Sequence, residues 1–537
     1  MMRVRKSLNE ASRKEMFHTA EILQKQLKAL RDQDPLCRLE DALAEAVENE
    51  DYVKAAELQG IREKVAELDE SHLPASKGGR LLFTAAHGSD LAACNIDGGD
   101  VRRPLGPEER KKIKESGQIQ QPCWSRNGEM LAFTVLKVGT GAVEASRIVV
   151  VNEITGEKVL KVKVPNPPFF LMWLRDNKTI SYMCNDGVNR VQLVELDTSQ
   201  PAAPQEKGSG KQHAARIIDT GQPASKFGLN QFTQLLSSPS ISSLLAAPCW
   251  QLTQPPVPCL ALAPSGAPLF YSYSKIHNDI VVHNGSKNGV FRLERESGAW
   301  TKLSDSHGPQ FMAPQPHAVG GTDAVIVVED GHLVSVTTNG NAKKKLLPVK
   351  GFSSFGISPD QSKVCLMQQD LATGFYSLAV LQDKDGETDA LDPTSAATLE
   401  LKEIPIENIA LAFFFSPDSK KLLLLSTQAK KGELAVARGF LKRGSNLGCS
   451  WMVYDLETNK VTEYARFHPR PFFVKVYLPF LDQFQLSFTP WSPDSTAFCF
   501  ASIKGGWVQR LAGEGDEKPP VPTKISSSVE VGSWSPR

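Results

Sequence analysis

The sequence lacks the features that usually announce a metal site, a disulfide framework or a membrane span. Its nine cysteines contain no C-x-x-C pair and are odd in number, which argues against a zinc ribbon and a disulfide scaffold. No run approaches the roughly 18 unbroken apolar residues of a spanning helix. The closest, "IALAFFFSPDSKKLLLL", is interrupted by turn and charged residues. We therefore expect a soluble protein with reduced, mostly buried thiols.

An excess of one charge is also missing. The chain has 61 Lys and Arg against 60 Asp and Glu, so no global field attracts nucleic acid or an anionic membrane. The basic start, "MMRVRKSLNEASRKEMF", has no secretory apolar core, and it contains Glu10 and Glu15, which transit peptides avoid. We expect either no targeting segment or one already removed.

Catalytic signatures are absent as well. There is no G-x-S-x-G elbow, no H-E-x-x-H pair and no G-x-x-x-x-G-K-[ST] loop. The nearest approach to an elbow, "GFSSFG", is one residue too long and opens a predicted strand. The sequence therefore predicts a protein that is not an enzyme, with no cofactor and no metal.

The composition of residues 1–70 indicates helices. They contain no glycine before Gly60 and a single proline, Pro35, and they are rich in Ala, Leu, Glu, Lys and Gln. After Pro35, "LEDALAEAVENEDYVKAAELQGIREKVAEL" places apolar residues at helical spacing on both sides of "ENED". This pattern predicts two helices that form a hairpin, with a linker at 71–79.

The hairpin resembles the UVR motif, the helical module of the UvrB and UvrC repair proteins, several Clp-type chaperones and plastid proteins. The match is best over 35–70, and "LNEASRKEMFHTAEILQKQLKAL" upstream resembles a degenerate second copy. In that family the hairpin binds proteins or pairs with itself. The partner-binding face that the resemblance and the spacing imply consists of Leu39, Ala42, Tyr52, Ala55, Ala56, Leu58 and Ile61. After Leu58 the family usually continues Arg-Asp, whereas this chain has Gln59 and Gly60.

From residue 80 the pattern changes to short apolar runs separated by Gly, Asn, Asp, Ser and Pro, which indicates many short strands. Repeats of "CWSRNGEMLAF", "FSPDSKKLLLL" and "PWSPDSTAFCF" suggest a propeller. The predicted units lie near 119–163, 167–200, 266–304, 308–347, 351–404, 407–466 and 485–526. The chain ends in "EVGSWSPR", and "GGRLLFTAAHGSDLAAC" near residue 80 supplies the strands that should follow it.

We therefore predict a mainly β protein, an eight-bladed propeller over 80–537 closed by its N- and C-terminal strands, behind an α-helical hairpin. Seven blades is the alternative, because the "YSYSKIHND" and "HAVGGTDAVIVV" units match poorly. The repeats resemble TolB-like and dipeptidyl-peptidase-like propellers, and "FVKVYLPFLDQFQLSFTPWSPDS" is similar to a segment of plastid and cyanobacterial TolB-like proteins. Residues 201–258, rich in Pro, Ser and Gln, are expected to be a disordered insertion.

One polar and aromatic stretch is a candidate recognition patch. "RFHPRPFFVKVYLPFLDQF" places His468, Arg470, Asp482 and Gln483 among aromatic side chains, namely Phe472, Phe473, Tyr477, Phe480 and Phe484. Two interpretations stay open: a patch at the mouth of the propeller, or aromatic residues that fill the core between blades.

These observations favour a non-catalytic scaffold or adaptor, in which the hairpin recruits a partner protein and the propeller offers a second surface. One alternative is a propeller enzyme or small-ligand binder that acts at the central channel. A weaker one is a DNA-repair accessory by analogy with UvrB and UvrC, although nucleic acid is not an expected partner. The resemblance implies the chloroplast stroma, with the cytoplasm as the alternative.

Overall fold

The structure is a computed structural model that describes Asp51, Lys54 and most of residues 79–536. The longer gaps in the described residues lie at 200–214, 224–270, 315–323, 431–447 and 478–487. The chain divides into two compact units, residues 1–73 and residues 74–537. The predicted hairpin belongs to the first unit, and apart from Asp51 and Lys54 it lies outside the described residues.

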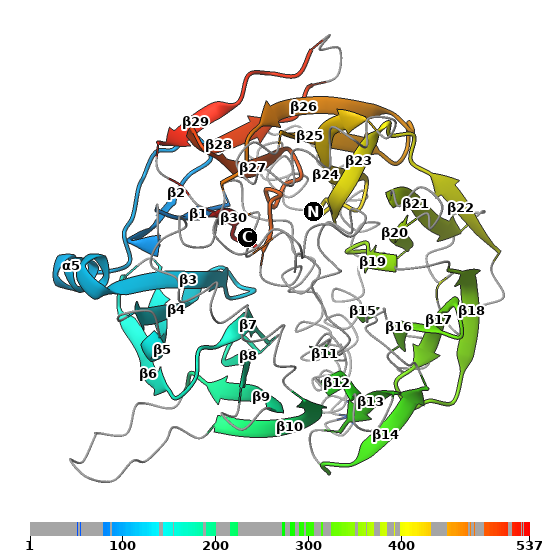
Figure 1. Ribbon diagram of the computed structural model, residues 1–537, viewed down its shortest axis with the longest axis horizontal. Coiled ribbons are helices and arrows are strands. Elements are labelled where there is room, and N and C mark those ends of the chain that lie inside the picture. Colours follow the sequence, from blue (N-terminus) through cyan, green and yellow to red (C-terminus); the bar gives the residue numbers. More distant parts are fainter. Residues whose placement is uncertain are drawn as a thin grey trace, which may run out of the picture. The chain divides into compact units, whose positions relative to one another are not determined.

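The described part of the second unit is mainly β, and its strands form eight antiparallel sheets placed around a common centre (Figure 1). Six sheets have four strands in chain order, and two have three strands. The first three four-stranded sheets are β3 (Gly117–Trp124), β4 (Met130–Val138), β5 (Val143–Asn152) and β6 (Lys158–Val164); β7 (Phe169–Trp173), β8 (Thr179–Asn185), β9 (Arg190–Asp197) and β10 (Ala215–Pro223); β11 (Tyr271–Tyr273), β12 (Ile280–Asn284), β13 (Gly289–Leu293) and β14 (Trp300–Ser304).

The remaining sheets follow the same order. They are β15 (Ala313–Pro314), β16 (Ala324–Glu329), β17 (His332–Thr337) and β18 (Lys343–Pro348); β19 (Ser353–Ile357), β20 (Lys363–Gln369), β21 (Tyr376–Asp383) and β22 (Leu399–Glu403); β23 (Asn408–Phe415), β24 (Lys421–Lys430), β25 (Cys449–Asp455) and β26 (Val461–Phe467); β27 (Ala497–Ser502), β28 (Gly505–Arg510) and β29 (Thr523–Ser526). The two units that match the repeat poorly in sequence, β11–β14 and β15–β18, thus form four-stranded sheets like the others.

Within each four-stranded sheet the strand that comes first in the sequence lies nearest the centre, and most of the last strands form the periphery (Figure 1). Burial follows this position. Every residue of β27 is buried, whereas β18 alternates between exposed and half-buried residues. A strand packed between neighbouring sheets must be apolar on both faces, and a peripheral strand only on one. This difference explains why β27 contains the continuous apolar run "AFCFA", whereas β18 has the mixed sequence "KKKLLP".

The two ends of the second unit share one sheet. β30 (Val531–Trp534) pairs with β1 (Leu81–Thr84), and β1 pairs with β2 (Leu91–Cys94). The register joins Leu81 to Trp534 and Thr84 to Val531. The expectation that the C-terminal "GSW" run pairs with the strand near residue 80 therefore agrees with the observed pairing.

The Ser-Pro-Asp segments make one repeated turn, which lies immediately before β20, β24 and β27. In the turn that begins at Ser492, the serine Oγ donates to Asp494 Oδ1 at 2.7 Å and accepts from the Ala497 N–H at 2.9 Å. The Ser492 N–H in turn donates to the Ala497 carbonyl at 2.8 Å. The turns at Ser358 and Ser416 repeat these bonds. The side chains of this motif therefore serve the backbone of the turn, as expected for Asp and Ser.

The same bonding pattern crosses the two chain ends. Ser535 Oγ accepts from the Arg80 N–H at 3.0 Å, and the Ser535 N–H donates to the Arg80 carbonyl at 2.7 Å. Arg80 thus takes the place that Ala497 has in the Ser492 turn. One turn of the repeat is assembled from two segments 455 residues apart.

Neighbouring turns are also linked to each other. The Asp360 N–H donates to Ser419 Oγ at 2.9 Å, and the Asp418 N–H donates to Ser495 Oγ at 3.0 Å. Both serines have positive φ, 60° and 59°, a conformation that costs energy for residues other than glycine. We infer that the hydrogen bond from the adjacent sheet offsets this cost and orders one turn against the next.

These turns predict an acid-sensitive fold. Burial alone would raise the pKa of Asp494, but hydrogen bonds from Ser492 and Thr496 lower it below the usual value, and Asp360 behaves in the same way. A carboxyl with a lowered pKa in the folded state contributes stability above its unfolded pKa and loses it as the pH falls through its folded pKa. We expect the urea concentration at the unfolding midpoint to decrease when the pH is lowered below about 4. Asp494→Asn keeps an acceptor for Ser492 and should weaken this pH dependence, and an unchanged profile would contradict the assignment.

Two further elements bear on the predicted boundaries. Strand β10 lies within the stretch 201–258 and pairs with β9; residues 201–214 and 224–258 are outside the described residues. The helix α5 (Pro107–Ser116) leads into β3 and buries Ile113 against the sheet that begins there. No helix in the described ranges is apolar and long enough to cross a bilayer.

Candidate functional site

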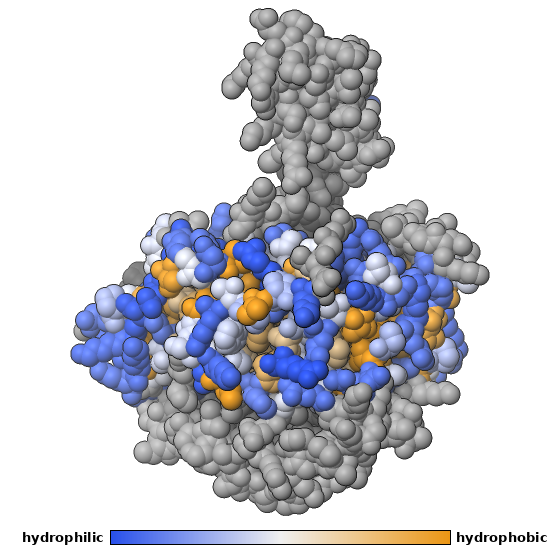
Figure 2. Space-filling view, turned by 90° about the horizontal axis from the view of Figure 1, so that it is seen from above, coloured by the Kyte–Doolittle hydropathy of each residue, from blue (hydrophilic) through white to orange (hydrophobic). Residues whose placement is uncertain are grey.

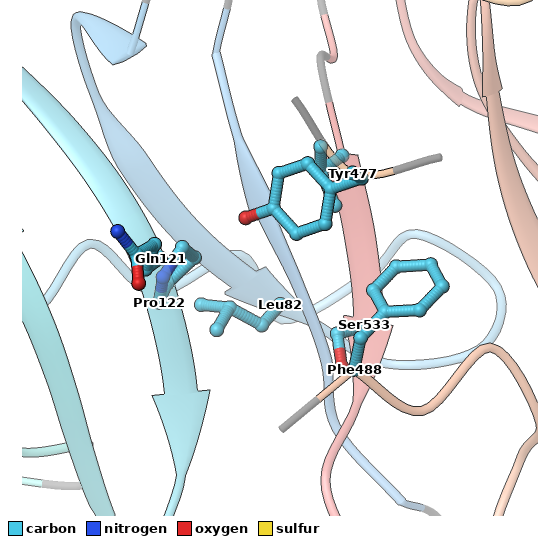
Figure 3. A pocket seen from close by; sticks show the side chains of 7 residues that line it. Leu82, Gln121, Pro122, Tyr477, Phe488 and Ser533 are labelled. Atoms are coloured by element: carbon cyan, nitrogen blue, oxygen red, sulfur yellow. The ribbon is translucent and has the colours of Figure 1, made fainter. Parts of the chain in front are cut away.

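A small cavity lies where the sheet made from both chain ends meets the sheet that begins with β3 (Figure 3). It is lined by Leu82, Gln121, Pro122, Tyr477, Phe488, Val531 and Ser533. Its volume is about 10 Å³, which is the room that one water molecule needs. Ligand pockets are usually some thirty times larger or more. The cavity therefore cannot hold a small-molecule substrate.

Gln121 connects two neighbouring sheets beside this cavity. Its amide nitrogen donates to the Pro168 carbonyl at 3.1 Å, and its amide oxygen accepts from the Leu171 N–H at 3.2 Å. The residue has a φ of 49° and lies at a bulge of β3. Positive φ at a buried residue marks a position that its surroundings hold in place. Here two hydrogen bonds to the next sheet account for it.

Tyr477 reaches the same place from a distant part of the sequence, and Figure 3 shows its hydroxyl pointing toward the side of the cavity where Gln121 lies. The side chain is 4% exposed, and burial raises its pKa although a backbone hydrogen bond from Gln121 opposes the shift. The Phe473 ring stacks on the Tyr477 ring with 6.4 Å between the ring centroids, and Phe473 is 6% exposed. Of the two interpretations of this aromatic stretch, core filling therefore holds for Phe473 and Tyr477.

The polar members of the predicted mouth patch are placed differently. His468 and Arg470 follow β26, the peripheral strand of its sheet, and not a strand near the centre. The His468 carbonyl accepts from the Ile503 N–H at 2.9 Å, and Arg470 Nε donates to the Ser502 carbonyl at 3.0 Å. Both thus contact the turn between β27 and β28. Asp482 and Gln483 lie outside the described residues.

Arg80 forms a charged junction that the sequence analysis did not single out. Its guanidinium contacts Glu153 at 2.8 Å and Asp100 at 2.6 Å, and it donates to Asn95 Oδ1 at 3.0 Å. The Arg80 side chain is 14% exposed and that of Glu153 only 3%. Glu153 belongs to the turn between β5 and β6, so the pair joins the sheet of the chain ends to the next one. No local sequence motif indicates this ion pair, because Arg80 and Glu153 are 73 residues apart in the sequence.

The cysteines of the described residues are not activated nucleophiles. All six are free and buried. Burial raises the pKa of Cys94 to about 11, and it raises that of Cys123, Cys365, Cys449 and Cys499 further. A reactive cysteine needs a lowered pKa and access to solvent. Within the same residues, no group of three His, Cys, Asp or Glu side chains could hold a metal ion.

The predicted hairpin face lies outside the described residues: Leu39, Ala42, Tyr52, Ala55, Ala56, Leu58 and Ile61. The two described residues of this region carry one informative bond. The Lys54 N–H donates to Asp51 Oδ1 at 3.1 Å, and Lys54 is helical. This is the bond of a helix N-cap, and it agrees with a helix that begins after the "ENED" break.

Polar residues dominate the visible surface of the second unit. On the face shown in Figure 2, hydrophobic residues form small groups separated by hydrophilic ones. Scattered apolar groups of this kind are ordinary on protein surfaces. The coloured residues of this face therefore form no continuous apolar surface.

No family model matches the chain, and no curated protein does. Solved structures that are similar to it include a eukaryotic initiation factor, with 12% identity, 86% of this chain and 99% of that chain covered, and a TM-score of 0.43. TolB from Acinetobacter baumannii shares 12% identity over 57% of this chain and 61% of its own, with a TM-score of 0.28. The WD40 domain of SCAP from fission yeast shares 9% over 73% and 88%, with a TM-score of 0.37.

Prolyl endopeptidases are also among the similar structures, at 14% identity. Identities this low and TM-scores below 0.5 carry no argument about activity, substrate or site residues. The strand pairings of this chain alone define its fold.

Proposed function

We propose that the protein is a non-catalytic scaffold or adaptor, in which a UVR-like hairpin recruits a partner protein and the β unit is a second binding platform. The observation that carries this proposal is the division into two compact units, with a helix cap at Asp51 where the hairpin pattern expects the second helix to begin. Short helices bury little surface alone and leave an apolar face for a partner or for a second copy.

The proposed platform is an eight-bladed, TolB-like propeller in which the pairing of β30 with β1 closes the ring. Eight separate sheets around one centre support eight blades over seven. Hydrogen bonds between successive turns, such as Asp360 to Ser419, support a rigid ring. The polar side chains at the sheet junctions, including Gln121 and Arg80, are bonded to neighbouring sheets. This favours a surface role over chemistry at those junctions.

The hairpin is tested by a charge placed on its predicted apolar face. Tyr52→Asp with Ala55→Glu should abolish the capture of a specific partner, or of a second copy, by the full-length chain. Lys54→Ala, on the same helical turn but at an exposed position, should leave capture unchanged. The measurement is affinity capture with mass spectrometry, together with the molar mass by light scattering.

Circular dichroism confirms that the β unit stays folded in both variants. If every partner and the molar mass persisted in the double variant, the hairpin would be a structural element and the proposed recruiting role would be wrong. The resemblance also leads us to propose the chloroplast stroma as the location, with the cytoplasm as the alternative, and a fluorescent fusion of the full chain would distinguish them.

A further inference from the structure

The segment that leads into β29 contains three prolines in four residues, "KPPVPTK", from Lys518 to Lys524. Proline fixes φ near −65° and also pushes the preceding residue out of the α region. Pro519, Pro520 and Pro522 are therefore restricted themselves, and Val521 is restricted by Pro522. Polyproline II is the regular conformation that satisfies these restrictions, and it has three residues per turn.

The protein holds this segment in place from one side. Gln509 of β28, which is fully buried, donates from its amide nitrogen to the Pro520 carbonyl at 2.7 Å. Immediately afterwards, Thr523 pairs with Val508 at the start of β29. The segment is thus anchored at its middle and at its end. An extended peptide that is already ordered loses little conformational entropy when it binds.

Exposure has the period that polyproline II predicts. Pro519 and Pro522, three residues apart, are half-buried, whereas Pro520 and Val521 are exposed. Val521 is 88% exposed, and the other exposed large hydrophobic residues of the described part lie between 41% and 50%. One edge of the segment therefore faces the protein, and an apolar edge faces the solvent at the periphery of the sheets, next to β29 (Figure 1).

The charged residues beside this apolar edge restrict the kind of partner surface that can bind it. Lys518 and Lys524 are both exposed and flank the proline core, and Lys524 lies over the Trp507 ring at 5.7 Å. The acidic residues Glu514, Asp516 and Glu517 precede the core in the sequence and lie outside the described residues. A complementary surface needs aromatic side chains for Pro520 and Val521, and acidic groups beyond Thr523.

We infer that Lys518–Lys524 is a docking segment for a protein domain with an aromatic-lined groove that binds polyproline II and has an acidic rim. Such grooves recognise proline-rich segments because the ligand is ordered in advance. This docking segment rests on the proposed function in one respect: it assigns a class of partner to the β unit as a binding platform. Its test uses residues of the β unit and none of the hairpin, so the two proposals can fail separately.

A competing role for the prolines is to protect the sheet edge. Three of the four residues before β29 have no N–H, so the segment cannot pair with a further strand. Edge strands often carry proline for this reason. That role requires no partner, and it makes no use of the exposed Val521 side chain.

The experiment titrates the full-length protein against an array of purified SH3, WW and EVH1 domains by fluorescence polarisation. We expect at least one domain with an acidic groove rim to bind. Val521→Asp and the pair Pro519→Ala with Pro522→Ala should each weaken that binding by about tenfold or more. Ile503→Asp, which changes a 50% exposed residue at the turn between β27 and β28, is the matched control and should bind like the wild type.

The urea midpoint of Val521→Asp should equal that of the wild type, because the side chain makes little contact with the protein. Loss of binding without loss of stability would then support the docking segment. If no domain of the array bound the wild type, or if Val521→Asp bound equally well, the inference would be overturned and edge protection would remain.

Discussion

Arg80→Ala should lower the free energy of unfolding by roughly 3 kcal/mol. The substitution leaves the Glu153 carboxylate, whose side chain is 3% exposed, without its close cation. Among the described residues, Arg102 also approaches Glu153, with 3.7 Å between its guanidinium and the carboxylate, but its side chain is 39% exposed, so solvent screens its contribution. A buried charge that loses its partner keeps its desolvation cost. Urea unfolding followed by tryptophan fluorescence measures the effect.

Two controls separate the ion pair from the general loss of an arginine. Arg103→Ala removes an exposed arginine near Asp90 and should change stability by only about 0.5 kcal/mol. Arg80→Ala combined with Glu153→Gln removes the stranded charge and should recover a large part of the loss. Equal effects of Arg80→Ala and Arg103→Ala would show that this pair does not hold the two sheets together.

Trp534→Ala should cost about 3–5 kcal/mol. Trp534 lies on β30, is 1% exposed and packs in one cluster with Leu81 of β1 and Cys499 of β27. The substitution thus opens a cavity at the strand that joins the C-terminal end to the N-terminal strand. Trp507→Ala removes a half-exposed indole that stacks on Phe500 and should cost far less. Thermal and urea unfolding of both variants compare the two positions.

Phenylalanine variants distinguish packing from hydrogen bonding at the equivalent tryptophans. The buried Trp534 indole N–H has no hydrogen-bond partner among the described residues, so Trp534→Phe loses packing alone. The Trp491 indole N–H donates to the Phe414 carbonyl at 3.1 Å, and Trp491→Phe should cost about 1 kcal/mol more than Trp534→Phe. A Trp534→Ala variant as stable as the wild type would mean that β30 is not needed to complete the fold.

Local patterns were enough to predict much of the second unit. The Ser-Pro-Asp turns follow from the preference of proline and aspartate for turns, and the structure forms them at Ser358, Ser416 and Ser492. The incomplete repeat at the C-terminal end predicted its pairing with the strand near residue 80, and β30 does pair with β1. Each of these features depends on residues close in sequence or on repetition of one unit.

The sequence patterns do not predict the long-range contacts. Nothing near Arg80 indicates Glu153, and nothing near Gln121 indicates that Tyr477 lies beside it. The placement of His468 and Arg470 beside the turn at Ser502 is likewise a consequence of how β26 leads into the next sheet. Such partners are selected by the order and rotation of the sheets, which no single repeat encodes.

The sequence by itself determined the strand-rich unit, its turn chemistry and the pairing of its two ends, because these depend on alternation, proline and repetition within short distances. Only the tertiary structure decided which polar side chains are buried and paired. It also decided which aromatic residues fill the core, and which prolines face the solvent. The physical reason is that burial depends on the neighbouring sheet: residues from far along the chain enclose Tyr477, whereas Val521 remains 88% exposed.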